Sequence, residues 1–306
     1  MPLSSLVQRS FHARAILIGL MWVTGAAVAE VPRASPAPDT GSTTLSTPSN
    51  VTDTVEVSAE REALRNEAAR FVSSLVRTQN ETLTRWSTPI CPSVAGMSRD
   101  LGEFVLARVS QVAIEAGAPL DGSECRANFY VILTDDPRQL VKTLRKRNSG
   151  IFGETVPAAL DRFTNANTPV RAWYSTTFNN EDGTPPMPDA SAKGRFRLRD
   201  SRIVSTLIEN VTTAIVVVDS RLTQGATVGQ LADYVAMVGL AQVDLNAEFE
   251  TPTILHVFAD PDSSHDRPAG LTKWDRAFLR GLYRTSQGAL KQRSLIVNSM
   301  FEDMSQ

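Results

Sequence analysis

Histidine is scarce in this sequence, and its scarcity argues against the commonest hydrolytic sites. Only three histidines occur in 306 residues, and one of them, His12, lies in the apolar N-terminal segment. His256 and His265 are too few for the histidine-rich sets that usually hold zinc. A serine hydrolase would need one of them as its base, and the sequence contains no Gly-x-Ser-x-Gly. A standard zinc site or a serine-histidine-acid triad is therefore not expected.

A long apolar run is also missing. The run near the N-terminus, 15–29, falls short of the about 20 residues of a membrane-spanning helix. Arg9 and Arg14 precede it and Ala-Val-Ala ends it, which is typical of a secretory signal peptide, here residues 1–29, cleaved before Glu30. An uncleaved anchor is the alternative. With cleavage, the sequence predicts an exported protein, periplasmic or extracellular, without stable membrane insertion.

Positive charge is not in excess. The chain has 31 basic and 33 acidic residues, and removal of a signal peptide that contains Arg9 and Arg14 makes the balance more acidic still. Proteins that bind nucleic acids usually carry a surplus of lysine and arginine. No nucleic-acid partner is therefore expected.

Cysteine occurs only twice, as Cys91 and Cys125, both in the exported part. In an oxidising compartment two such cysteines are expected to form a disulfide, and closing the loop between them is worth about 3–4 kcal/mol in the chain-entropy model. Free thiols are the alternative. A metal site built on the pair is a further reading, but no histidine lies near either cysteine.

The mature chain divides into a tether and one folded domain. Residues 30–54 are rich in Pro, Ser and Thr without periodic apolar positions, which indicates a disordered tether. Residues 55–306 are long enough for a single α/β domain. Helices are expected at 59–78, 99–116, 137–146, 155–163, 274–283 and 290–300. Strands are expected at 55–57, 128–134, 170–178 and 214–219, with 195–198 returning as the partner of 170–178.

The stretch 227–244 follows the most apolar expected strand and has a clear helix start. Thr227 and Gln230 have the spacing of a capping box, so a helix should begin at Val228. Leu231, Val235 and Val238 recur at helical spacing. On this stretch alone, an ordinary core helix is the simplest interpretation.

The same stretch resembles the active-site helix of zincin metallopeptidases without its metal ligands. That helix carries His-Glu-x-x-His, in which two histidines hold zinc and the glutamate acts as base. In this frame Ala232 and Ala236 stand at the histidine positions and Asp233 at the glutamate position. Gly239 matches the glycine of the longer motif, and Gln242 stands where a third histidine would be.

Two later stretches extend the resemblance. Pro252-Thr253-Ile254-Leu255 resembles the Pro-Ser-Ile-Met turn under the zinc of metzincins, with leucine in place of methionine, and 271–283 resembles the closing helix of matrixin-like domains. The chain is also similar to a group of secreted bacterial proteins with the same three elements and no assigned activity. The resemblance implies a zincin-like mixed sheet, a single domain with no zinc or other cofactor, and no peptidase activity.

Such a protein is expected to bind a peptide or an envelope protein. Candidate binding residues are Asp233 and Gln242 on the helix, Arg171 and Trp173 on the strand 170–178, and the basic row. The basic row consists of Lys193, Arg195, Arg197, Arg199 and Arg202. It is either a solvated edge strand guarded by charge or an edge that recognises an anionic ligand.

Two other functions stay open. An active hydrolase could use Asp233 or Asp244 with a metal held in the loop 260–266, whose oxygen-rich side chains are also compatible with calcium or with plain solvation. A purely structural envelope protein is the third possibility.

Overall fold

A computed structural model describes most of the chain from residue 50 onward. The described residues are 50–75, 83–153, 156–180, 184, 187–188, 196–197, 208–259, 266–287 and 291–305. For 50–58, 187–188 and 196–197 the description covers the backbone only. The expected signal peptide, residues 30–49 of the expected tether, residues 260–265 of the acidic loop, and Lys193, Arg195, Arg199 and Arg202 lie outside the described residues.

The centre of the molecule is a five-stranded mixed sheet built around β7 (Ile208–Asp219). β4 (Val170–Asn179) runs antiparallel along one side of β7. The other side pairs in parallel with β3 (Phe129–Thr134) and, nearer the start of β7, with β1 (Arg85–Trp86). β2 (Pro92–Ala95) runs parallel to β3. The α/β class is thereby confirmed, and the strand expected at 214–219 lies at the centre of the sheet as part of β7.

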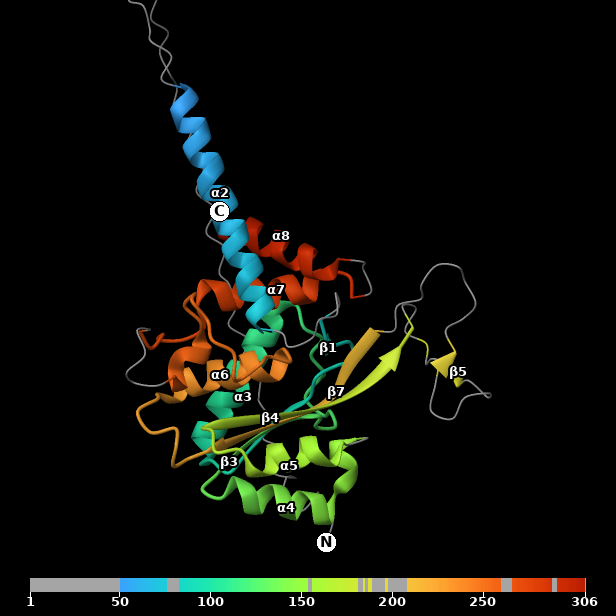
Figure 1. Cartoon of the computed structure of the whole chain (residues 1–306). Coiled ribbons are helices and arrows are strands. Elements are labelled where there is room, and N and C mark those ends of the chain that lie inside the picture. The colour runs from blue at the N-terminus through green and yellow to red at the C-terminus, as the bar shows by residue number, and fades with distance from the viewer. Residues whose placement is uncertain are drawn as a thin grey trace, which may run out of the picture.

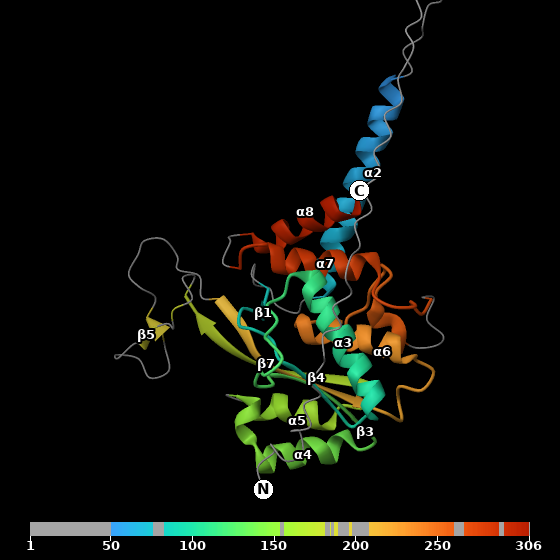
Figure 2. The ribbon, with the colours of Figure 1, turned by 180° about the vertical axis from the view of Figure 1, so that it is seen from behind.

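Helices cover both faces of this sheet (Figure 1). One face carries α4 (Pro137–Arg147), the short η1 (Ser149–Phe152) and α5 (Pro157–Asn165). The other face carries α3 (Arg99–Ala116) and α6 (Val228–Leu240), as the reverse view also shows (Figure 2). Beyond them lie α2 (Asn50–Leu75), η2 (Ile254–Phe258), α7 (Lys273–Arg284) and α8 (Gln292–Met304).

The side chains of β7 alternate between the two faces of the sheet and contribute to two apolar cores. Ala214, Val216 and Val218 belong to the large core shared with α3, α6 and α7, whereas Ile215 and Val217 belong to the smaller core under α4 and α5. Successive side chains of a strand point to opposite faces, so a strand with both faces covered is apolar throughout. This explains why β7 contains the most apolar run of the sequence after residue 29.

Two strand predictions are wrong. Residues 55–57 belong to α2, which begins at Asn50 and so includes the last five residues of the expected tether. Extending a helix adds one hydrogen bond per residue, which outweighs the strand preference of two valines. Phe196–Arg197 form β6, which pairs with β5 (Met187–Pro188) and not with β4. The one strand paired with β4 among the described residues is β7.

The predicted disulfide is confirmed. Cys91 and Cys125 are joined, with their Cα atoms 5.8 Å apart. Cys91 directly precedes β2, and its carbonyl oxygen accepts hydrogen bonds from the backbone N–H groups of Asn128 and Phe129. The disulfide therefore holds the loop before β3 against the start of its neighbouring strand. Within the described ranges, no helix combines the length and apolar character needed to cross a bilayer.

Candidate functional site

Helix α6 starts as the sequence predicts and lies very close to the sheet. Thr227 Oγ1 accepts a hydrogen bond from the Gln230 N–H (3.1 Å), and Gln230 Oε1 accepts one from the Thr227 N–H (2.9 Å), which confirms the capping box. Near its other end, Gly239 faces the ring of Phe129 in β3. A Cβ atom at residue 239 would lie 1.8 Å from the ring atom Cζ. Only glycine allows this approach of helix to sheet.

The two histidine positions of the zincin frame lie inside the core. Ala232 and Ala236 precede Gly239 by seven and three residues, so all three lie on one stripe of the helix. Both alanines have no exposed surface and belong to the large apolar core. Their stripe faces the sheet, and side chains on it do not reach a cleft.

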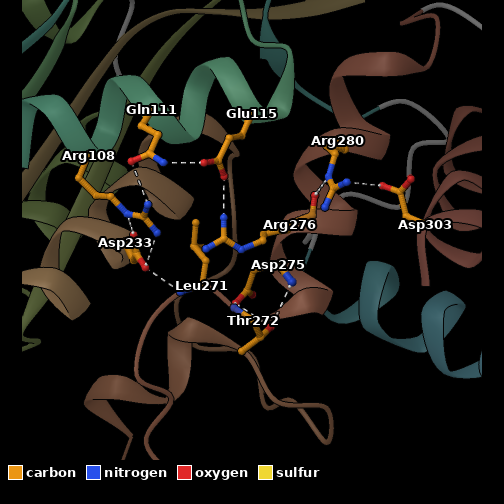
Figure 3. A network of polar contacts seen from close by, with 10 residues as sticks. All are labelled: Arg108, Gln111, Glu115, Asp233, Leu271, Thr272, Asp275, Arg276, Arg280 and Asp303. Atoms are coloured by element: carbon orange, nitrogen blue, oxygen red, sulfur yellow. Dashed lines mark hydrogen bonds and ion pairs between the residues drawn. The ribbon is translucent and has the colours of Figure 1, made fainter. Parts of the chain in front are cut away.

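Asp233, at the glutamate position, is occupied by structural contacts. Arg108 of α3 donates to both carboxylate oxygens, through Nε to Oδ1 and through Nη2 to Oδ2 (3.1 Å). The backbone N–H of Leu271 donates to Oδ2 as well (2.8 Å). Arg108 continues into the polar network of α3 and α7 (Figure 3). Asp233 is 4% exposed and ties α6 to α3 and to the segment before α7.

A second buried carboxylate, Asp275, joins the turn 252–255 to α7. It accepts hydrogen bonds from Thr253 Oγ1 (2.6 Å) and from the Ile254 N–H (2.8 Å). It also accepts from the N–H and Oγ1 of Thr272, which forms a capping box at the start of α7 (Figure 3). Burial raises the pKa of Asp275, and these hydrogen bonds oppose the rise.

Aromatic side chains bind the last carbonyl groups of α6. The Tyr174 hydroxyl donates to Val238 O (2.6 Å), Trp86 Nε1 to Gly239 O (2.8 Å), and the Tyr283 hydroxyl to Leu240 O (2.6 Å). These carbonyls have no partner within the helix, so each donor satisfies a group that would otherwise be unpaired. Burial raises the pKa of both tyrosines, which keeps their hydroxyls protonated.

A cavity of about 260 Å³ opens at this end of α6, between β4 and α7. Its lining residues are Leu83, Thr84, Ala172, Tyr174, Ala241, Gln242, Val243, Asp244, Leu245, Asn246, Phe278 and Leu282. Gln242 is half-buried, and no described residue makes a hydrogen bond with its amide. Of the five positions taken from the zincin frame, Gln242 is the one in the wall of this cavity. We refer to this cavity as the β4 pocket.

The edge of β4 beside the pocket presents free backbone groups. The Asp219 N–H donates to Pro169 O (2.9 Å), so residues 171, 173 and 175 direct their N–H and C=O groups toward β7. Ala172 and Tyr174 therefore direct theirs away from β7. No described strand pairs with that edge. Both side chains line the β4 pocket.

Arg171 and Trp173 lie on the opposite face of the sheet from the pocket. Arg171 is 6% exposed, and its Nη1 donates to Thr164 O at the end of α5 (3.1 Å). Trp173 Nε1 donates to Phe152 O (3.1 Å), and the two rings meet edge to face. The sheet separates both residues from Gln242. Asp233 lies in the first half of α6, whereas Gln242 follows the last residue of that helix. Arg197 is described only as part of the β6 backbone.

Sequence reasoning missed most of the pocket. Tyr174, Thr84 and Leu245 were not candidates, and neither was Glu209, which accepts a hydrogen bond from Thr84 Oγ1. One pattern in the sequence could have indicated part of the pocket. Tyr174 stands two residues after Ala172 in a strand, so the side chains of both residues face the same side of the sheet. Nothing local in the sequence relates that strand to residues 241–246.

The described residues contain no group of three or more His, Cys, Asp or Glu side chains close enough together to hold a metal ion. Comparison of the whole chain with protein-family models, curated proteins and solved structures gives no significant match.

Proposed function

We propose that this protein is an exported binding protein that holds an extended peptide segment along the free edge of β4 and does not cleave it. One observation carries the proposal. Ala172 and Tyr174 direct their backbone groups to the open edge while their side chains line the β4 pocket. A strand added there would gain main-chain hydrogen bonds from both residues and could place a side chain in the pocket.

Gln242 adds a further recognition group. Its amide has both a donor and an acceptor, and it lies in the pocket wall without a partner among the described residues. A peptide backbone or a polar side chain at the pocket mouth could use both. A free peptide and an extended segment of an envelope protein both fit this site, because the recognition chemistry is the same.

The contacts among the three matching stretches support a zincin-like scaffold behind this function. Asp275 and Tyr283 of the last stretch bind the turn 252–255 and the end of α6, respectively. The resemblance implies a mixed sheet, and the sheet of this protein combines parallel and antiparallel strands. The alanines at the two histidine positions and the sequestered Asp233 support binding without peptidase activity.

Export is supported by the N-terminal sequence and by the disulfide. Disulfides persist mainly in oxidising compartments, and the signal-like segment 1–29 would lead the chain there. We therefore propose a periplasmic or extracellular location.

Hydrogen exchange tests the docking edge directly. Acetylated and amidated pentapeptides of sequence Thr-Val-Xaa-Val-Thr serve as probes, because valine and threonine favour extended strands. Binding should slow exchange of the outward N–H groups of Ala172 and Tyr174. The N–H groups of Arg171 and Trp173, already bonded to β7, should change little.

A proline at the edge provides the matched variant. Ala172→Pro removes an outward N–H group and leaves the hydrogen bonds to β7 in place, a position at which edge strands tolerate proline. It should abolish peptide binding with an unchanged circular dichroism spectrum. Peptide binding that survives this substitution, or protection confined to residues outside β4, would refute the proposed edge.

A further inference from the structure

A second cavity, of about 360 Å³, is formed mainly by α3 and α7. We refer to it as the α7 cavity. Its lining residues are Val112, Glu115, Ala116, Leu271, Arg276, Leu279, Arg280 and Arg284. None of them lines the β4 pocket, although α7 contributes to the walls of both. The lining of the α7 cavity thus includes three arginines and one carboxylate.

The three arginines form one row along α7. Arg276, Arg280 and Arg284 follow one another at intervals of four residues, which places them on the same side of the helix. Successive members lie about 6 Å apart along the helix axis. Their side chains are 33%, 36% and 58% exposed, respectively. Neighbouring guanidinium groups of the row can therefore reach the same small ligand from the solvent side of the cavity.

This row carries more positive charge than its partners neutralise. Arg276 Nη1 donates to Glu115 Oε2 (2.6 Å; Figure 3). Arg280 and Arg284 share one carboxylate, that of Asp303 on α8, at 3.4 and 3.1 Å. No described residue accepts a hydrogen bond from Nη2 of Arg280 or of Arg284. Three guanidinium groups thus face two carboxylates, and the excess charge and the unused donors lie at the Arg280–Arg284 end.

The rest of the lining is apolar and lies deeper. Its four residues are at most 8% exposed and belong to the large core: Val112, Ala116, Leu271 and Leu279. Because the arginines are more exposed than these residues, the positive charge lies at the mouth of the cavity, with apolar surface beneath it. Such a site suits a ligand with an anionic end and an apolar part. Among anions, phosphate matches the planar fork of a guanidinium group, which can donate two parallel hydrogen bonds to it.

We infer that the α7 cavity binds the phosphate group of a phosphomonoester whose alcohol part is apolar. Arg280 and Arg284 donate to the phosphate oxygens through their unused N–H groups, and the apolar part lies against Leu279 and its neighbours. A soluble alkyl phosphate and a lipid phosphate share this chemistry. The site is separate from the β4 edge, so the inference goes beyond the proposed function and does not depend on it.

Three probes separate charge from apolar contact: inorganic phosphate, hexyl phosphate and hexanol. Isothermal titration calorimetry at low ionic strength should show hexyl phosphate binding about tenfold more tightly than inorganic phosphate, because a few buried methylene groups contribute that much. Hexanol, which lacks the charge, should bind at least about tenfold more weakly than hexyl phosphate. High salt should weaken the binding of both phosphates.

Three protein variants with the same change of charge locate the site. Arg280→Gln and Arg284→Gln each remove one guanidinium group and should weaken the binding of hexyl phosphate about tenfold. Arg147→Gln, at the exposed end of α4 on the other face of the sheet, is the control and should leave the affinity unchanged. Thermal melting checks that the variants are folded. Arg284 is the more exposed of the two cavity arginines, so its variant tests the site even if Arg280→Gln does not fold.

Each adverse outcome overturns a defined part of the inference. Equal affinity for inorganic phosphate and hexyl phosphate would overturn the ester and its apolar contact. Hexyl phosphate binding that is unchanged in folded Arg284→Gln, or equally weakened in Arg147→Gln, would overturn the assignment to the α7 cavity. Failure of hexyl phosphate to bind at millimolar concentration would overturn the site itself. Peptide binding at β4 should be the same in all three variants, so the two proposals fail independently.

Vesicles identify the source of the phosphate. The protein is sedimented with vesicles of phosphatidylcholine, with and without phosphatidic acid. Sedimentation that requires phosphatidic acid and is lost in Arg284→Gln assigns the cavity to a membrane phosphate. Binding of hexyl phosphate without such sedimentation assigns it to a soluble phosphomonoester.

Discussion

The contact between Gly239 and Phe129 makes Gly239→Ala the most informative single substitution in the fold. The added methyl carbon would lie 1.8, 2.3 and 2.6 Å from three ring atoms of Phe129. Carbon atoms in contact prefer about 3.5–4.0 Å, so the ring or the helix must move by well over an ångström. Phe129 has no exposed surface, and α6 is held by Tyr174, Trp86 and Tyr283.

The expected result is a net loss of stability of about 2 kcal/mol. Overpacking a rigid core costs about 1–3 kcal/mol, and this contact belongs at the upper end because neither partner can move freely. Alanine recovers about 1 kcal/mol through its higher helix propensity. For a domain of this size, the melting temperature should fall by about 4–8 °C. Urea unfolding followed by tryptophan fluorescence measures the free-energy change.

The same helix supplies the control. A Cβ atom at Gly229 would meet only Thr227 Oγ1, at an ordinary 3.8 Å. Gly229→Ala should therefore stabilise the protein by up to about 1 kcal/mol. Adding Phe129→Leu to Gly239→Ala should recover part of the loss, with a coupling energy of about 1 kcal/mol or more. If Gly239→Ala were as stabilising as Gly229→Ala, the close approach of α6 to β3 would be refuted, and with it the burial of positions 232 and 236.

Two further predictions concern contacts that hold the scaffold together. Asp233→Asn should lower the free energy of unfolding by about 1–2 kcal/mol, because Arg108 loses its charged partner while the Leu271 N–H keeps an acceptor. The affinity for peptide should not change. A loss of affinity in a folded variant would place Asp233 in the binding site instead. Reducing the Cys91–Cys125 disulfide should lower stability by about 3–4 kcal/mol, measured as the shift of the urea midpoint with and without reductant. A midpoint unaffected by complete reduction would mean that the loop before β3 is already constrained without the bond.

The local features of the fold follow from short patterns in the sequence. The capping boxes at Thr227 and Thr272, the apolar central strand and the pairing of the two cysteines need only neighbouring residues or a simple count. These features depend on backbone groups and side chains a few residues apart, so the sequence contains all the information they require.

The candidate site could not be read in the same way. Ala172, Gln242 and Thr84 come from three separate parts of the chain, and Glu209 from a fourth. The alignment of Asp233 with a catalytic glutamate was an inference from one helix. Its actual partner, Arg108, lies 125 residues away in the sequence. Arg171 and Trp173 alternate with the pocket residues, so one residue of register decides which side of the sheet each occupies.

The sequence by itself determined where α6 begins, which cysteines join, and that histidines are missing from the α6 stretch, because each depends on composition or on spacing within a few residues. Only the tertiary structure decided that the alanines of α6 face the sheet and that Asp233 is enclosed. It also decided that the open edge of β4 lies beside the β4 pocket. Those facts arise from the packing of segments distant in the chain, and no local pattern encodes which segments will meet.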